Sequence, residues 1–190
     1  MKKKFILSII SLILLTFSII KYINADKEMY YYGKNNLPIY QNKLPFGMKP
    51  EYWDYRRDNS GFNIIDHIDF KSVGRSVGCW EYPGIIIDSV ISYGFNDTLL
   101  IAIIEDTSKN LYCYKQNDTL SFEFTPLKEC NIEQMKKDYN LKWIETANKL
   151  PENISSARFF SGILFYISLI LFIIYFRKYL KEKHKEVKNK

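Results

Sequence analysis

Residues 74–78 read Gly-Arg-Ser-Val-Gly and match the G-x-S-x-G pattern of a nucleophile elbow. An elbow presents its serine hydroxyl at a sharp turn between a strand and a helix. The next residues, Cys-Trp-Glu-Tyr-Pro-Gly at 79–84, do not begin a long helix, and the histidine that follows Ser76 in the chain is His184, close to the C-terminus. We therefore expect a glycine-bounded loop here rather than hydrolase chemistry.

His67 lies between Asp66 and Asp69, and strand alternation would place His67 and Asp69 on one face. Such a pair suggests a general base or a metal ligand. A zinc site needs further histidines or cysteines nearby, and this stretch offers none, so we expect a solvated strand face. The sequence also contains no P-loop, dinucleotide glycine fingerprint or C-x-x-C motif, so we assign no catalytic residue, metal or cofactor.

The chain has three cysteines, Cys79, Cys113 and Cys130. An odd count leaves at least one thiol free or paired with another molecule. Cys113 falls on an expected strand and Cys130 just before an expected helix, so a Cys113–Cys130 disulfide would join the helix to the sheet. The alternative is three buried thiols that act as small hydrophobic side chains.

Aromatic residues cluster in two runs, Tyr30 to Tyr32 and Tyr52 to Tyr55. Tyrosine and tryptophan dominate binding hot spots because they bring a large contact area at low entropic cost. The alternative is that these rings pack on the open face of the sheet or rest at a membrane interface. The candidate binding surface comprises Tyr30, Tyr31, Tyr32, Tyr52, Trp53 and Tyr55.

Two uncharged apolar segments lie near the chain ends, at 5–20 and 159–176. A helix needs about 20 residues to cross the hydrocarbon core of a membrane, and roughly 17 suffice. The first segment reaches this length over 5–23 if Lys21 extends its ammonium group toward water. We predict transmembrane helices over 5–23 and 159–176. A signal peptide cleaved after Ala25 is the alternative for the first segment, and a buried core helix is the alternative for the second.

The excess of positive charge, +6 over the whole chain, lies beside these two segments and leaves the middle mildly acidic. Nucleic acid binding is therefore not expected. Lysine and arginine favour the cytoplasmic side of a membrane, which places the basic end 1–4 and the tail 177–190 in the cytoplasm. Residues 24–158, with an irregular aromatic-rich arm over 24–60, are then extracytoplasmic at the plasma (inner) membrane. The tail residues expected to contact anionic lipid are Arg177, Lys178, Lys181, Lys183 and Lys185.

The middle of the chain has the pattern of an antiparallel meander. Runs of β-branched and aromatic residues alternate with short polar turns, which is typical of hairpin-connected strands. The run over 98–105 is apolar on both faces, so it should be a central strand that is covered on both sides. The strands are expected over 64–70, 85–93, 98–105, 111–115 and 119–125.

Residues 131–150 carry apolar side chains near a 3.6-residue period and predict one amphipathic helix that covers the sheet. Asn131 is the expected N-cap, Gln134 fits the capping-box spacing, and Pro151 ends the helix. The fold class is therefore α+β, a small antiparallel β-meander with one amphipathic helix, flanked by N- and C-terminal transmembrane helices.

These patterns favour a membrane-anchored extracytoplasmic binding module of unknown ligand, non-enzymatic, with a protein or envelope component as its partner. An envelope enzyme or accessory subunit is one alternative. A protein that gives immunity to a membrane-directed toxin is another. The small residues Ala157, Ser161 and Gly162 near the second span would allow close helix approach, so a homodimer through that helix is also expected.

Overall fold

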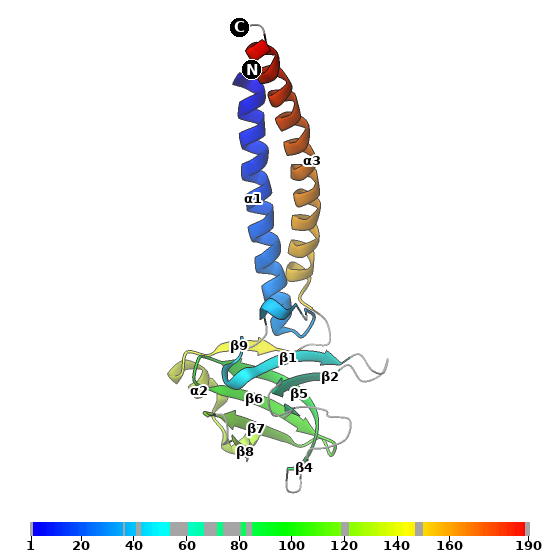
Figure 1. Ribbon diagram of the computed structural model, residues 1–190. Helices are drawn as coiled ribbons and strands as arrows, with labels where there is room; N and C mark the ends of the chain where they lie inside the picture. Colours follow the sequence, from blue (N-terminus) through cyan, green and yellow to red (C-terminus); the bar gives the residue numbers. More distant parts are fainter. Residues whose placement is uncertain are drawn as a thin grey trace. The chain divides into compact units, whose positions relative to one another are not determined.

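The computed structural model describes residues 2–35, 37–40, 43–53, 61–66, 72–73, 81–82, 85–118, 122–146 and 150–188. The chain forms two compact units (Figure 1). One unit combines residues 1–28 with 151–190, and the other comprises residues 29–150.

The helical unit contains α1 (Lys2–Tyr31), whose last turn belongs to the sheet unit, and α3 (Glu152–Lys188). Both helices are long and apolar enough to cross a membrane. Only 17% of the most apolar stretch of α1 and 11% of that of α3 is buried, unlike the core helix of a soluble domain. Both helices extend beyond the predicted spans because charged and polar residues at their ends continue the same hydrogen-bonded helix.

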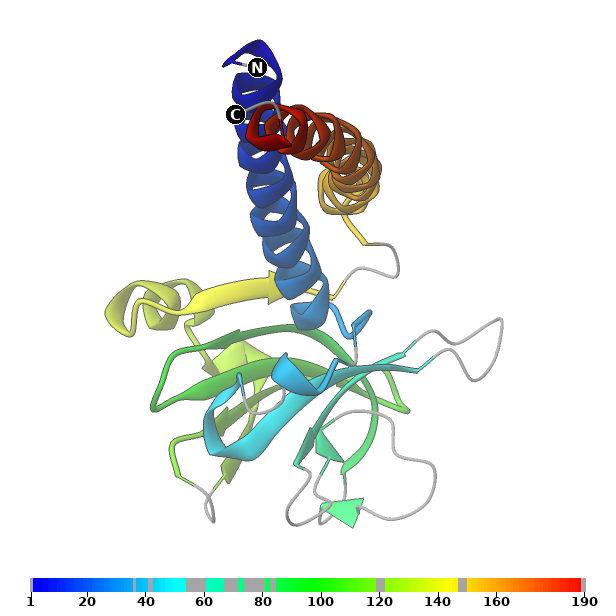
Figure 2. The same cartoon turned by 45° about the horizontal axis from the view of Figure 1, so that its top comes forward.

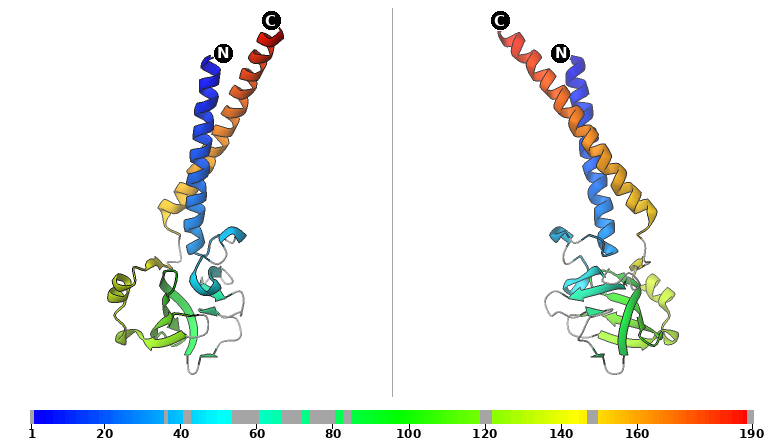
Figure 3. Two further views of the ribbon diagram at one scale, coloured as in Figure 1. Left: turned by 60° about the vertical axis from the view of Figure 1, so that its left-hand side comes forward. Right: turned by 90° about the vertical axis from the view of Figure 1, so that its right-hand side faces the viewer.

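α1 and α3 run antiparallel and lie side by side within this unit (Figure 3). At one end the Lys4 ammonium pairs with the Glu182 carboxylate. At the other end Arg158 Nε lies 2.9 Å from Asp26 Oδ1, and the Asp26 side chain is buried. One ion pair at each end thus connects the two helices. Small hydroxyl side chains are buried along the two helices: Ser8, Ser11, Ser18, Ser161 and Ser168.

The sheet unit is built on an antiparallel meander, which confirms the predicted α+β class. The meander strands are β5 (Ile85–Phe95), β6 (Leu100–Asp106), β7 (Leu111–Gln116) and β8 (Phe122–Pro126). Two short strands, β4 (Glu81–Tyr82) and β9 (Lys142–Glu145), pair with β5. The three polar turns of the sequence fall between consecutive strands, as expected from their composition.

The segment 24–60 was predicted to be irregular, but its described residues contain regular secondary structure. Its first residues continue α1, and short 3₁₀ turns follow at η1 (Pro38–Tyr40) and η2 (Pro45–Gly47). Next comes a second antiparallel sheet, shown beside β5 in Figure 2. Tertiary packing supplies the order that local periodicity does not indicate. The strands of this second sheet are β1 (Met48–Trp53), β2 (Gly61–Asp66) and β3 (Ser72–Val73).

β6 is central in the meander and buried on both faces, as predicted from its continuous apolar run. Leu100, Ala102 and Ile104 point to one side, which we call the tyrosine face because tyrosines cover it. Ile101 points to the other side together with Cys113 of β7, and we call this the cysteine face. Successive side chains of a strand point to opposite faces of the sheet, so neighbouring residues of β6 belong to different hydrophobic clusters.

The helix predicted over 131–150 is wrong in its length. α2 covers only Ile132–Asp138, and the predicted cap is present, with Asn131 Oδ1 accepting a hydrogen bond from the Gln134 backbone N–H at 3.0 Å. Asn140 then adopts a left-handed conformation, φ 47°, which ends the helix. The next residues form β9 because the edge of β5 offers backbone hydrogen-bonding partners there.

Candidate functional site

The first aromatic run of the predicted binding surface packs inside the sheet unit. Tyr30 and Tyr31 are 2% and 6% exposed and lie in the core on the tyrosine face. Tyr32 is half-buried and packs against the same cluster. The Tyr93 hydroxyl donates a hydrogen bond to the Tyr31 carbonyl, which ties the end of α1 to β5. All three rings therefore pack on the sheet, which was the alternative to an exposed binding surface.

The second aromatic run is only partly described. Tyr52 and Trp53 lie on β1, opposite Phe62 and Gly61 in the register with β2. Their side chains, and the whole of Tyr55, lie outside the described part of the chain. These residues stay predictions.

The described part of the sheet unit has a groove between the start of β7, the end of β8 and the 3₁₀ turn η3 (Leu127–Glu129). Its volume is about 630 Å³. Tyr112 and Pro126 are opposite each other in the β7–β8 register and form its centre. Leu111, 38% exposed, contributes open apolar surface. The groove is lined by Asn110, Leu111, Tyr112, Pro126, Leu127 and Lys128.

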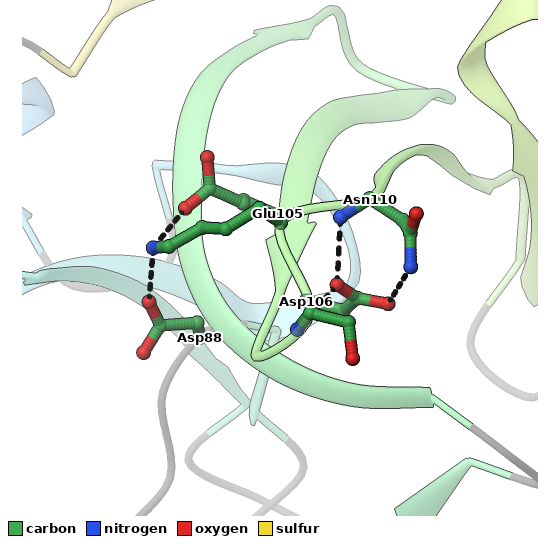
Figure 4. Close-up of polar contacts among 6 residues, drawn as sticks. Asp88, Glu105, Asp106 and Asn110 are labelled. Carbon is green, nitrogen blue, oxygen red and sulfur yellow. Dashed lines mark hydrogen bonds and ion pairs between the residues drawn. The ribbon is translucent and has the colours of Figure 1, made fainter.

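One wall of the groove is held by the tight turn between β6 and β7, shown in Figure 4. The Asp106 carboxylate accepts hydrogen bonds from the backbone N–H of Ser108 at 2.8 Å and of Asn110 at 2.7 Å. It also accepts one from Asn110 Nδ2 at 2.9 Å. Hydrogen bonding, first of all by the Asn110 side chain, lowers the pKa of Asp106 because these donors favour the charged carboxylate.

A small ion network lies on the same turn (Figure 4). Lys109 Nζ lies 2.5 Å from Glu105 Oε1 and 3.2 Å from Asp88 Oδ2, so it bridges β5 and β6. Hydrogen bonds to Glu105 and then to Asp88 raise the pKa of Lys109. Lys109 also has positive φ, 68°, as the turn requires. The ammonium is exposed to water, so these pairs orient the turn more than they stabilise the fold.

The lining of the groove is both apolar and polar. Leucine and proline side chains form its apolar part, and an amide, a phenol and an ammonium group form its polar part. Ligand and peptide sites also combine an apolar surface with a few polar groups. Among these six described residues there is no nucleophile paired with a base.

Sequence reasoning did not find this groove. Its two sides are separated along the chain by the β7–β8 hairpin, and only the register brings Tyr112 opposite Pro126. The Asp-Thr-Ser-Lys-Asn sequence at 106–110 was readable as a turn, since aspartate and asparagine favour turns through local hydrogen bonds. Nothing in the sequence linked that turn to a concave surface.

The residues considered for catalysis fall mostly outside the described part of the chain. This applies to Ser76, His67 and Asp69, while Asp66 ends β2 and its side chain is not described. Among residues 2–35, 37–40 and the other described stretches, no three or more histidine, cysteine or acidic side chains gather as a metal site would require.

Cys113 and Cys130 are brought together on the cysteine face, as their predicted pairing requires. Both are thiols in this structure. Cys113 is 2% exposed, whereas Cys130 is half-buried at the end of η3. Burial, followed by the neighbouring Cys130 side chain, raises the pKa of the Cys113 thiol to about 12.

The basic tail is helical and open to solvent. The five residues expected to contact lipid all lie on the last turns of α3 and are exposed: Arg177, Lys178, Lys181, Lys183 and Lys185. Ser161 and Gly162, which suggested a homodimer, occupy a different environment. Ser161 is buried, and a Cβ on Gly162 would lie 3.9 Å from the ring of Tyr22 on α1. Ala157, the third small residue, is exposed, and the homodimer stays a prediction.

Comparison with known proteins places the chain in no group. No family model, no curated protein and no solved structure matches it.

Proposed function

We propose that this protein is a two-span membrane protein that displays residues 29–150 outside the cytoplasm as a non-enzymatic binding module. The observation that carries the proposal is the antiparallel pairing of two apolar helices within one unit. The Lys4–Glu182 pair puts the basic start of α1 beside the basic end of α3. Positive charge at the shared end of both helices favours a cytoplasmic position for that end.

Retention of α1 is part of this proposal. In the full chain α1 runs without a break through residue 25, Ala25 is buried, and the next residue, Asp26, pairs with Arg158 of α3. Cleavage after Ala25 would remove this helix and leave α3 without its partner. We expect the purified protein to keep its full mass of 22.6 kDa. An N-terminus at Asp26, found by mass spectrometry, would contradict retention.

Topology is tested with two single-cysteine variants. The background carries Cys79→Ser, Cys130→Ser and Cys113→Ala, with alanine at the buried site because a serine hydroxyl there would lack a partner. Asn117→Cys places a thiol in the exposed turn after β7, and Lys185→Cys places one near the end of α3. Intact spheroplasts are treated with a membrane-impermeant maleimide.

We expect position 117 to label in intact spheroplasts and position 185 only after lysis. The reverse pattern would overturn the proposed orientation. Equal labelling of both positions in intact spheroplasts would show that the two sites share one compartment and would overturn the two-span arrangement.

We further propose that the groove beside η3 is the surface that contacts the partner. Its combination of open leucines with polar groups at the edge matches the composition of interface centres and rims. A photo-crosslinking benzoylphenylalanine is placed at Leu111, 38% exposed, or at Ile91, 37% exposed, as the matched control away from the groove.

In membranes we expect a discrete crosslinked product from position 111 and none from position 91. The product should disappear in a Leu127→Asp variant that still folds, because a carboxylate would be desolvated against the bound partner. A product that persists in this variant, or that forms equally from position 91, would contradict the groove as the binding surface.

A further inference from the structure

The path of the chain after β8 returns Cys130 to the sheet face on which Cys113 lies. Cys113 is on β7, opposite Thr125 of β8, and it points into the cysteine face. Pro126 and η3 then turn the chain back over that face. Cys130 packs against the cluster that contains Leu99, Ile101 and Cys113.

The two thiols lie in one apolar cluster but differ in access. Cys113 is shielded, while Cys130 is half-buried and open to a reagent from solvent. A disulfide that forms by exchange needs one accessible thiol to begin and one adjacent thiol to finish, and this pair offers both.

We infer that Cys113 and Cys130 form an intramolecular disulfide that joins β7 to the segment carrying η3. The inference rests on the proposed extracytoplasmic location, because disulfides persist in oxidising compartments. It also concerns the proposed groove, since η3 lines one side of it and would be tied to the sheet by the new bond. The oxidant is a small disulfide that exchanges with protein thiols.

The exchange balances in two steps. The Cys130 thiolate attacks a donor disulfide, forms a mixed disulfide and releases one donor thiolate. Cys113, after losing its proton, attacks the Cys130 sulfur, forms the internal disulfide and releases the second donor thiolate. The two cysteines together lose two electrons and two protons, and the donor disulfide gains them and becomes two thiols, which for oxidised glutathione are two glutathione molecules. Burial keeps the Cys113 thiol protonated, so the second step is the slower one.

The test uses the purified full-length chain in detergent with Cys79→Ser, which removes pairing with the third cysteine. Oxidised glutathione is the probe. We expect denatured protein to lose both maleimide-reactive thiols after oxidation, and peptide mapping to link positions 113 and 130. For a loop of this length we expect the unfolding temperature to rise by roughly 5–10 °C relative to the reduced chain.

Cys113→Ala and Cys130→Ala, each on the same background, are the matched controls. Cys113→Ala should stop at the mixed disulfide between Cys130 and glutathione, and Cys130→Ala should keep the buried Cys113 thiol unreacted in the folded chain. Neither variant should form an internal disulfide or show the rise in unfolding temperature. Two thiols that both remain reactive in the oxidised, folded parent chain would overturn the inference. So would a disulfide between two molecules, or a link from Cys79 to either partner in the wild-type chain.

Thiol counting in cells, after rapid acid quenching, separates this inference from the proposed function. Oxidised cysteines in cells support both. Reduced cysteines in cells, together with a disulfide in the purified chain, support the pairing and count against the extracytoplasmic location.

Discussion

The two faces of the central sheet are covered in different ways. The tyrosine face is sealed by residues distant in sequence, with Tyr30, Tyr31 and Met48 among its buried contacts. The cysteine face is covered by one continuous local segment, η3, α2 and β9, most of whose apolar side chains are only half-buried. The cover from distant residues buries its side chains deeply, whereas the local cover leaves the Cys130 side chain half-buried and the groove open.

If the tyrosine face carries most of the stability, truncating its centre should have the largest effect. Leu100 is fully buried there. We expect Leu100→Ala to lower the free energy of unfolding by about 3 kcal/mol, because it removes buried methyl groups and leaves a cavity. Chemical denaturation of the full-length chain in detergent, followed by circular dichroism, measures this.

Met135→Ala on α2 is the control from the cysteine face. Its side chain is half-buried, so we expect a loss of only about 1 kcal/mol. Equal losses for the two variants would contradict the proposed difference between the faces.

The close approach of β5 and β9 is the next most sensitive contact. A Cβ added to Gly94 would lie 2.2 Å from Cε3 of Trp143, the residue opposite it in the β5–β9 register. We expect Gly94→Ala to cost about 2 kcal/mol because the indole ring must move away. Thermal unfolding followed by circular dichroism measures the change.

Trp143→Ala in the same chain provides the control for this clash. The double variant should be less destabilised than the sum of the single variants, because the alanine at position 94 then meets no ring. If the free-energy losses of the two single variants simply added in the double variant, the glycine would be needed for a reason other than this clash.

The start of the local cover on the cysteine face depends on a single cap. Asn131 Oδ1 accepts from the Gln134 N–H, and α2 is short. We expect Asn131→Ala to destabilise the fold by about 1 kcal/mol, and Asn131→Asp to preserve stability, because both asparagine and aspartate cap helices. Faster hydrogen exchange in α2 of the alanine variant, with unchanged exchange in β6, would confirm that the effect is local.

The smallest expected effect is on the loss of stability at low pH. Because the folded pKa of Asp106 is lowered, its stabilising contribution is complete above the unfolded value of about 4 and is lost as the pH falls through the folded pKa. Asp106→Asn cannot titrate but keeps an acceptor oxygen. We expect the unfolding temperature of this variant to fall less steeply below about pH 4 than that of the parent. Parallel curves would contradict the role of the carboxylate.

Several local features were readable because they depend on neighbouring residues alone. Uncharged apolar runs predicted both long helices, and β-branched runs separated by polar turns predicted the meander. The position of β6 at its centre followed from apolar residues on both faces. The cap at Asn131 followed from its spacing to Gln134.

Other features depended on partners that are distant in sequence. The side chains of Tyr30 and Tyr31 suit an exposed binding surface as well as a core, and only packing against β5 buries them. The apolar period of residues 131–150 favoured one helix, but a left-handed Asn140 ends α2, and Lys142–Glu145 pair with β5 as the strand β9. The groove exists only because the register sets Tyr112 opposite Pro126.

The amino-acid sequence by itself determined which segments are apolar, where the turns fall and which faces of the strands are buried, since these follow from side-chain type and local period. The tertiary structure alone decided what covers each face and where a concave surface opens. These outcomes depend on contacts between residues far apart in the chain, and the local pattern of either partner does not contain them.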